Sequence, residues 1–476
     1  MTKAISEFVE WNLKNIGIVT RPNADNGLWL SLLLTGCFTV NMWNQDQQID
    51  LTYKRMTILC FGLFFHSFCI FLYLYHRKAE NGIGKYVYCA ISMSLTFSLF
   101  QVYLKDNRIL SLISTLFGVI SYDRIFFLAL KKMPRCFTLG EASVVSQGVV
   151  LFLYNTFLAV PAAFLHEKSP NETTSELHLI VQIILLGTGM MIISCHFILL
   201  LRYSICFWML FLIVTTGAML FPLHGKPTLQ ILLQFVFSDM QRILLVALYL
   251  TLLSIASIFV LWQMKQHGNA NTAFRKVFHV LILLVYFPGL LCQCNLLYVA
   301  SGGMLALLFL LETARIIKLN PLHEMLEAAV RCFVDDKDTG VVALTPIYLL
   351  VGCSLPMWLH PVPCDLTDSA GLNMIKLSAG VLSVGIGDTF ASVCGYYIGK
   401  HKWPGSTKSV EGTLANAIAQ LCVVFVLLKL RLIHLTVSKA AITGSAIITN
   451  VIVEAKTNQV DNLVLPLVTY IILGIV

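Results

Sequence analysis

Charge is the feature that this sequence has least of. Only 12% of its 476 residues are Asp, Glu, Lys or Arg, whereas about a quarter of a soluble domain is charged. Hydrophobic residues make up 57% of the chain, and the mean hydropathy is +0.78. Apolar runs of roughly 20 residues recur, and each is long enough to cross a bilayer as an α-helix. The composition excludes a soluble globular protein and predicts an all-α polytopic membrane protein.

Two motifs, one typical of metal sites and one of nucleotide sites, are also missing. There is no CxxC pair with the spacing of a metal site, and Cys292-Gln-Cys294 is the closest approach to one. Most of the 14 cysteines lie within apolar runs, so we expect small buried core residues and no disulfide framework. The pattern GxxxxGK[ST] does not occur, which excludes a Walker A nucleotide site.

A cleavable signal peptide, an internal repeat and a low-complexity tract are likewise not recognisable. The first residues, MTKAISEFVEWNLKNIG, are too polar for a signal peptide, so we expect the first span, near Gly27, to act as an uncleaved anchor. The net charge of +8 does not indicate nucleic-acid binding, because Lys and Arg of a membrane protein concentrate in cytoplasmic loops. We therefore expect no nucleic-acid partner.

The hydropathy pattern predicts about 15 transmembrane helices. We divide the chain into an N-terminal multi-span membrane region, residues 1–264, and a C-terminal catalytic membrane region, residues 265–476. The N-terminal region holds few intramembrane charges and has the character of a lipid-embedded scaffold. The predicted spans cover residues 28–44, 56–76, 86–104, 110–130, 143–165, 178–200, 204–223, 241–263, 277–298, 301–318, 341–359, 374–395, 412–430, 436–453 and 463–476.

Basic residues in the loops predict the orientation of these spans. They gather at residues 76–85, 131–135, 202 and 265–276, which the positive-inside rule places in the cytoplasm. Alternation then places the only N-x-[ST] sequon, at Asn171, on the lumenal side. It also places four polar segments of the last 200 residues on the cytoplasmic side. We expect the active site on that face.

The most informative of these segments runs from Gly385 to Thr413. Asp388 interrupts an apolar run, and a carboxylate at bilayer depth is a candidate functional residue because its burial is costly. A basic, glycine-rich loop follows, with Lys408 near its end. Such a loop suits a metal-bound phosphate, with backbone N–H groups at the next helix start assisting. Gly395 and Gly399 form a GxxxG pattern, for which we favour helix packing over ligand contact.

The other three segments each allow a functional and an ordinary interpretation. Arg275 and His279, at i and i+4, share a helix face and could hold a phosphate or could anchor the helix at the lipid headgroups. Asp335 and Asp338 could bind Mg²⁺ or could form a solvated turn. The segment from Glu454 to Asn462, which contains Asp461, offers carboxylates and amides at a helix mouth or is an ordinary loop.

These motifs resemble those of the polyprenol kinase family. The resemblance rests on GDTFAS, GKHKWPGSTKSVEGT and EAKTNQVDNLVLPL, with FRKVFH, FVDDKDTGVVALTPIYLLVGCSLPMWL and CFTLGEASVVSQG upstream. It is specific over residues 272–470 and looser before them. The long N-terminal membrane region is more similar to the family members that phosphorylate dolichol than to shorter ones such as phytol kinases.

The resemblance implies a CTP-dependent lipid kinase of the endoplasmic reticulum membrane, multi-pass, with its active site facing the cytoplasm. It would transfer the γ-phosphate of CTP to dolichol, giving CDP and dolichyl phosphate for N-glycosylation and other dolichol-dependent glycosylation. The expected partners are dolichol, CTP and the bilayer, with no sign of a soluble protein partner. The candidate CTP-binding residues are Gly387, Gly399, Lys400, His401, Lys402, Pro404, Gly405, Ser406, Thr407, Lys408, Ser409, Glu411, Gly412 and Thr413, with Arg275 and Lys276 from the helix entry.

Phosphoryl transfer depends mainly on alignment and on neutralisation of charge. We expect Asp388 to hold Mg²⁺ or another divalent cation, Lys408 and Lys402 to neutralise phosphate oxygens, and His279 to complete the cationic surroundings. Asp461 is the candidate second metal ligand or the base that orients the lipid hydroxyl, and Asp335 is a weaker alternative. Two other interpretations stay open: a CTP enzyme similar to phosphatidate cytidylyltransferase, and a polytopic transporter.

Overall fold

The computed structural model describes residues 2–44, 49–76, 83–165, 172–266, 272–333, 340–365 and 367–475. Most of these residues are helical, and the only strands among them are β1 (Pro222–Leu223) and β2 (Lys226–Pro227), which form one short hairpin. Helices satisfy every backbone hydrogen bond within the segment, as a bilayer requires. The all-α architecture is therefore confirmed. Asp335, Asp338 and Asn171 lie outside the described residues.

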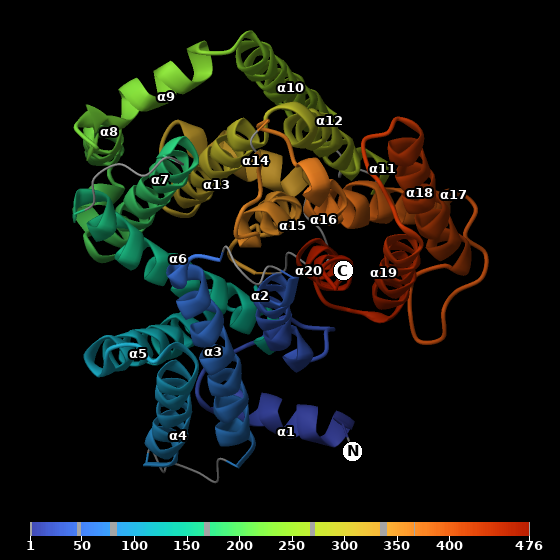
Figure 1. Cartoon of the computed structure of the whole chain (residues 1–476). Helices are drawn as coiled ribbons and strands as arrows, with labels where there is room; N and C mark the ends of the chain where they lie inside the picture. The colour runs from blue at the N-terminus through green and yellow to red at the C-terminus, as the bar shows by residue number, and fades with distance from the viewer. Residues whose placement is uncertain are drawn as a thin grey trace.

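The N-terminal region forms a helical bundle followed by an outer row of helices (Figure 1). Helices α3, α4 and α5 pack against one another, and α6 packs against α3 and α5. Helices α8, α9 and α10 follow one another along the outer edge of the molecule. The helices of this region are α1 (Thr2–Asn15), η1 (Leu28–Leu32), α2 (Leu33–Asn44), α3 (Leu51–His76), α4 (Ile83–Leu99), η2 (Phe100–Leu104), α5 (Arg108–Lys132), α6 (Leu139–Leu165), α7 (Glu172–Phe197), η3 (Leu199–Arg202), α8 (Ser204–Leu220), α9 (Thr228–Phe237) and α10 (Met240–Lys265).

The C-terminal region is arranged around its last helix. Helix α20 packs against α15, α19 and η5, and against α2 of the N-terminal region. Its residues Val464 and Leu465 are completely buried. The helices here are α11 (Thr272–Arg275), α12 (Val277–Cys292), α13 (Cys294–Ile316), α14 (Leu322–Phe333), α15 (Thr345–Leu359), η4 (Gly371–Asn373), α16 (Met374–Leu377), η5 (Val381–Asp388), α17 (Thr389–Tyr397), α18 (Val410–Lys429), α19 (Val437–Lys456) and α20 (Asp461–Leu473).

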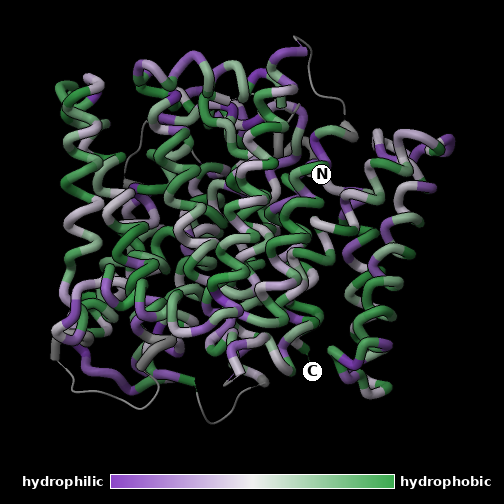
Figure 2. Tube along the Cα trace, turned by 90° about the horizontal axis from the view of Figure 1, so that it is seen from above, coloured by the Kyte–Doolittle hydropathy of each residue, from purple (hydrophilic) through white to green (hydrophobic). Residues whose placement is uncertain are grey.

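The helices are long and apolar enough for a multi-pass membrane protein. Nine of those described could each cross a membrane, or ten if the pair Gly371–Leu377 and Val381–Tyr397, bent by 48°, is one span. Every predicted span coincides with a helix or with successive helices, but several are only 10–17 residues long. Hydrophilic residues lie mostly toward the two ends of the bundle, with hydrophobic ones between them (Figure 2). The total of about 15 spans stays a prediction.

The two predicted regions share one hydrophobic core. A single cluster of buried side chains contains Leu34, Tyr122 and Tyr154 from the first region, and Tyr348 and Tyr470 from the second. The boundary at residue 265 stays a prediction.

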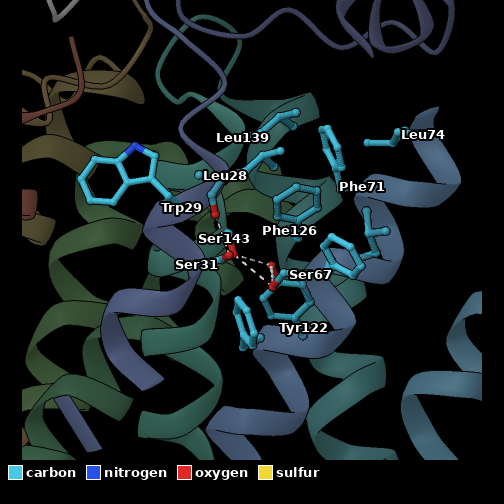
Figure 3. Close-up of a pocket in the computed structure, with 14 residues that line it drawn as sticks. Leu28, Trp29, Ser31, Ser67, Phe71, Leu74, Tyr122, Phe126, Leu139 and Ser143 are labelled. Carbon is cyan, nitrogen blue, oxygen red and sulfur yellow. Dashed lines mark hydrogen bonds between the residues drawn. The ribbon is translucent and has the colours of Figure 1, made fainter. Parts of the chain in front are cut away.

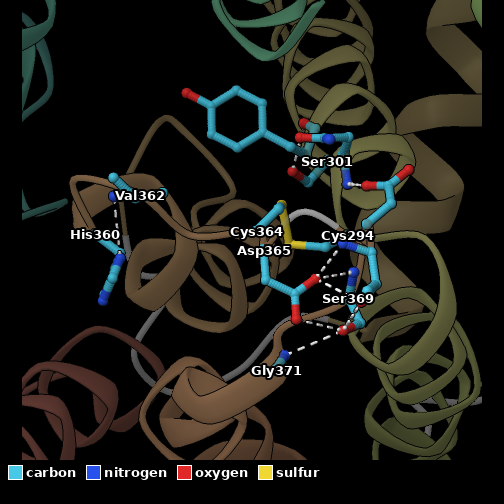
Figure 4. Close-up of a disulfide and its surroundings, with 12 residues drawn as sticks. Cys294, Ser301, His360, Val362, Cys364, Asp365, Ser369 and Gly371 are labelled. Atoms are coloured by element: carbon cyan, nitrogen blue, oxygen red, sulfur yellow. Dashed lines mark hydrogen bonds between the residues drawn. A yellow bond between two sulfur atoms is a disulfide. The ribbon is translucent and has the colours of Figure 1, made fainter. Parts of the chain in front are cut away.

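The expectation that the cysteines form no disulfide is wrong. Cys294, at the start of α13, is bonded to Cys364 in the loop after α15, with the Cα atoms 5.6 Å apart (Figure 4). The two residues are 70 positions apart, so no local spacing indicates the pair. Of the twelve free cysteines described, six are buried, whereas Cys292 and Cys422 are exposed. The burial expected of most cysteines therefore holds for half of these.

Candidate active site

Asp388 stands where a distorted helix meets a regular one. It is the last residue of η5, a π-helical segment that packs between α12, α18 and α20. π-Helical turns are rare and occur often at functional sites. Asp388 is only 7% exposed. The segment therefore carries a carboxylate into the protein interior, and a buried charge of this kind needs partners.

The partners of Asp388 come mainly from the start of α12. Lys276 Nζ donates to Asp388 Oδ2 at 2.5 Å, and His279 Nε2 lies 3.3 Å from the same oxygen. Ser392 Oγ donates to Oδ1 at 3.2 Å. The predicted segment around Arg275 and the predicted Asp388 therefore meet. Lys276, which stands between α11 and α12, makes the ion pair with Asp388.

A second ion pair lies at the mouth of α20. Lys408 Nζ donates to the backbone oxygen of Glu454 at 2.6 Å and lies 3.3 Å from both carboxylate oxygens of Asp461. Burial lowers the pKa of Lys408, but the nearby carboxylates of Asp461, Glu454 and Asp388 outweigh it and leave this pKa raised. Lys408 is therefore held as a cation between acidic groups.

Buried amides connect the two ion pairs. Asn416 Nδ2 donates to Glu454 Oε2, and Gln420 Nε2 donates to Asn416 Oδ1. A Cβ atom on Gly387 would lie 2.5 Å from Asn416 Oδ1, so the backbone beside Asp388 touches this amide directly. Glycine is required there because any side chain would strike Asn416. We call this group of residues the polar cluster: Lys276, His279, Asp388, Lys408, Asn416, Gln420, Glu454 and Asp461.

Several residues in the polar cluster or beside it were not singled out in the sequence. Glu454 was named only as part of its segment, and Asn416, Gln420 and Ser392 were not singled out. A signal was present, because Asn416 and Gln420 are at i and i+4 within an apolar helix and so share one face. Polar side chains on one face of a membrane helix are candidates for a buried site.

The predicted nucleotide segment runs from Gly399 to Thr413, and its loop part, residues 399–409, is mostly exposed. The loop folds into a tight turn. The backbones of Lys402 and Ser409 form an isolated antiparallel β-bridge, and Gly405 adopts φ +73°. Lys400, His401, Lys402, Pro404, Gly405 and Thr407 are exposed, and Lys408 alone among the loop's lysines reaches the polar cluster. Ser409 Oγ caps α18 by accepting from Gly412 N.

Two residues at the start of α18, Glu411 and Thr413, form side-chain contacts with the loop. His401 Nδ1 lies 2.6 Å from Glu411 Oε1, and Trp403 Nε1 donates to Thr413 Oγ1 at 2.9 Å. These contacts fix the exposed turn to the first turn of α18. The GxxxG pattern serves packing as predicted, because a Cβ atom on Gly399 would lie 2.6 Å from Ser409 Oγ.

A buried ion pair from the N-terminal region fixes the loop that leads into Asp461. Arg21 and Glu141 lie 2.6 Å apart with side chains 4% and 0% exposed. Glu141 Oε1 also accepts from Val460 N at 2.9 Å, and Arg21 donates to the backbone oxygen of Asn458 at 3.2 Å. We call this pair the N-terminal clamp. The N-terminal clamp connects the predicted N-terminal scaffold to the loop that precedes the candidate site residue Asp461.

A cavity lies in the N-terminal bundle, apart from the polar cluster. It has a volume of about 240 Å³, and apolar side chains such as Phe71 and Phe126 line it (Figure 3). The hydroxyls of Ser67, Tyr122 and Ser143 bond to one another at its wall. None of the described lining residues belongs to the polar cluster. The cavity therefore does not extend the candidate site.

The fold and the site define a multi-pass helical membrane protein with buried carboxylates and lysines at helix ends. Comparison with known proteins identifies its relatives. A family model for dolichol kinase matches residues 119–349. Dolichol kinases from three mammals align with most of the chain. That of Mus musculus is 36% identical over 72% of this chain and 66% of its own length, that of Homo sapiens 36% over 72% and 65%, and that of Bos taurus 34% over 76% and 69%.

The chain belongs to the dolichol kinase family. This confirms the family that the sequence motifs indicated, and the match to the family model ends at residue 349, before Asp388 and the predicted CTP-binding segment. The alignments span 65–66% of the length of the mouse and human relatives. No solved structure matches the chain.

Proposed function

We propose that this chain is a CTP-dependent dolichol kinase that transfers the γ-phosphate of CTP to the terminal hydroxyl of dolichol, forming dolichyl phosphate and CDP. One observation carries the proposal. Segments far apart in the sequence bring Lys276, Asp388, Lys408 and Asp461 into one buried polar cluster at helix ends. Alternating cations and carboxylates at a membrane surface suit a metal-bound triphosphate beside a lipid hydroxyl.

The side chains of the polar cluster fit a hard divalent cation. Asp388, Glu454 and Asp461 supply carboxylate oxygens, the ligands that Mg²⁺ prefers. Asp388 and Asp461 would hold the ion, which would neutralise charge on the β- and γ-phosphates when bound. Asp335 stays a further candidate ligand.

The lysines of the polar cluster would bind and orient the phosphates. Lys276 and Lys408 are both held by carboxylates, so each would exchange a carboxylate partner for a phosphate oxygen when CTP binds. Lys402, exposed in the turn, would reach the outer phosphates. Asp461 or Glu454 would accept the proton of the dolichol hydroxyl. Glu454 lies near the end of α19 and Asp461 at the start of α20, so both stand beside the loop that joins these helices.

The disulfide supports an active site on the cytoplasmic side of the endoplasmic reticulum membrane. Helix α12 begins beside Asp388 and ends two residues before Cys294, so its 16 residues separate the polar cluster from the disulfide by about 24 Å. Disulfides form in oxidising compartments such as the lumen of the endoplasmic reticulum. The opposite face would then be the cytoplasmic one, as the basic loops predict.

An activity assay tests the proposal. Membranes containing the chain would receive γ-labelled CTP, Mg²⁺ and dolichol, and label should appear in dolichyl phosphate. Asp388→Asn should abolish labelling at unchanged protein abundance, whereas Asp50→Asn, which alters an exposed acid, should not. Full activity of Asp388→Asn would remove this residue from the mechanism.

The same assay separates the alternatives. A CDP-lipid with release of pyrophosphate would indicate an enzyme similar to phosphatidate cytidylyltransferase. Movement of a solute without consumption of CTP would indicate a transporter.

A further inference from the structure

Three helices of the N-terminal bundle bring together an imidazole, a thiol and a carboxylate. His66 lies on α3, Cys89 on α4 and Asp123 on α5, and their ligand atoms all lie within 4.8 Å of one another. These three helices pack pairwise against each other. The group contains no member of the polar cluster and no residue that the proposed kinase reaction uses.

The hydrogen bonds of His66 leave one ring nitrogen with a free lone pair. Ser92 Oγ donates to the backbone oxygen of Cys89 at 2.9 Å, so its oxygen is available to accept from His66 Nδ1–H at 2.7 Å. That bond assigns the proton to Nδ1 and leaves Nε2 unprotonated. His66 is completely buried, and its Nε2 has no hydrogen-bond partner in the described part of the chain. Metal-binding histidines in proteins are held in this way, with the second nitrogen bonded to a neighbour.

Asp123 likewise has one side-chain atom that is hydrogen-bonded and one that has no partner among the described residues. Its Oδ2 accepts from Lys85 Nζ at 2.8 Å, whereas its buried Oδ1 lacks any partner among the residues described. A buried polar atom without a partner costs about 1–3 kcal/mol. One ring nitrogen of His66 and one carboxylate oxygen of Asp123 lie within 4.8 Å of the Cys89 sulfur. A bound ion would satisfy both atoms at once.

We propose that His66, Cys89 and Asp123 bind one divalent transition-metal ion of the zinc type. Imidazole nitrogen, thiolate sulfur and carboxylate oxygen are the usual ligands of Zn²⁺, and a thiolate disfavours Mg²⁺. A tetrahedral zinc site needs ligand atoms roughly 3.5 Å apart, given metal–ligand distances of about 2.0–2.3 Å. The three ligand atoms, now within 4.8 Å of one another, would move to this separation by rotation of their side chains when an ion binds. Three protein ligands leave a fourth position for water.

Lys85 and Ser92 complete the site as orienting residues. Lys85 holds Asp123 through Oδ2 and Ser92 holds His66 through Nδ1, so Asp123 Oδ1 and His66 Nε2 stay available to an ion. The proposed ion would also hold α4 in its place in the N-terminal bundle. Only 17% of the apolar window Gly84–Leu104 is buried, compared with 50% for Leu51–His76. An ion held by Cys89 would fasten this weakly buried helix to α3 and α5.

Cobalt substitution tests the site directly. The full chain would be purified in detergent, freed of metal with a chelator and titrated with Co²⁺. A thiolate-to-cobalt charge-transfer band should appear and saturate at a single ion per chain, and Zn²⁺ should displace it. Cys89→Ser should lose the band, whereas Cys422→Ser, which removes an exposed cysteine on α18, should keep it.

The wild-type protein alone can overturn the proposal. Absence of the band in folded wild-type protein would do so, whether or not the variants fold. A band of equal strength in Cys89→Ser would also reject the site, since the thiolate would then come from another cysteine. His66→Ala should weaken zinc retention, measured by elemental mass spectrometry after gel filtration, and unchanged retention would contradict the assignment of His66. None of these readouts depends on kinase activity.

Discussion

At the scale of single residues, the polar cluster consists of charges that depend on one another. The side chains of Lys276 and Asp388 are 13% and 10% exposed, so neither is well hydrated. Removing one member of a buried ion pair leaves an unpaired charge, which costs much more than removing both. Pairing of this kind keeps a carboxylate and an ammonium together in the protein interior.

Substitution of Lys276 should reveal this dependence. We expect Lys276→Met to lower the free energy of unfolding by about 3–5 kcal/mol, because Asp388 is left buried without its cation. The double variant Lys276→Met with Asp388→Asn should recover most of that loss while staying inactive. Thermal denaturation in detergent, arranged as a double-mutant cycle, measures the coupling. Additive effects of the two substitutions would show that the pair is not coupled in the folded protein.

At the scale of elements, the site depends on how closely η5 approaches α18. A Cβ atom on Gly387 would lie 2.5 Å from Asn416 Oδ1 and 2.8 Å from Gln420 Nε2. Gly387 was predicted to contact CTP, and the structure gives it a packing role beside that prediction. The contact sets the position of Asp388, the next residue.

Enlarging Gly387 should therefore disturb both stability and activity. We expect Gly387→Ala to destabilise the protein by about 1–3 kcal/mol through overpacking, and to lower labelling of dolichol because Asp388 moves with η5. Gly444→Ala on α19 is the matched control, since its Cβ would meet nothing within 4 Å. That variant should be neutral or slightly more stable, because alanine favours a helix. Equal behaviour of the two variants would argue against the packing role.

The N-terminal clamp is a second device at this scale. Arg21 and Glu141 hold the loop before Asp461 through Val460 N and the backbone oxygen of Asn458. Arg21→Met should leave Glu141 buried and unpaired, and it should lower kcat while leaving the KM for CTP nearly unchanged, because the clamp touches the loop and not the nucleotide. Arg21→Met with Glu141→Gln should recover only part of the stability, since the oxygen of the introduced amide can still accept from Val460 N but its NH2 group cannot accept from Thr138 N, which bonds to Glu141 Oε2 in the parent. A parental kcat in Arg21→Met would exclude the clamp as a positioning device.

The sequence indicates some of these elements and not others, for physical reasons. Hydropathy locates the helices because burial in lipid demands long apolar runs, and Asp388 is conspicuous because it breaks one. The bond between Cys294 and Cys364 and the contact of Glu141 with Val460 join residues 70 and 319 positions apart, so only the packing of helices reveals them.

At the scale of the whole molecule, the polar cluster and the disulfide occupy opposite ends of the same helices. Helices α12 and α15 both end on the disulfide side, where Asp239, Arg242 and Asp368 also form polar contacts. Basic loops gather at the other side in the sequence pattern. The proposed orientation, with the polar cluster facing the cytoplasm, is compatible with both the basic loops and the disulfide.

Accessibility in sealed microsomes tests this orientation. Lys400→Cys places a thiol in the exposed turn beside the polar cluster, and Thr367→Cys places one in the loop that carries Cys364. A membrane-impermeant maleimide should modify the first in intact vesicles and the second only after permeabilisation, each compared with the parent chain to subtract native cysteines. Modification of Cys294 and Cys364 should in addition require prior reduction. If Thr367→Cys reacted in intact vesicles and Lys400→Cys did not, the polar cluster would face the lumen. CTP would then have to reach it from a different compartment than the proposed function requires.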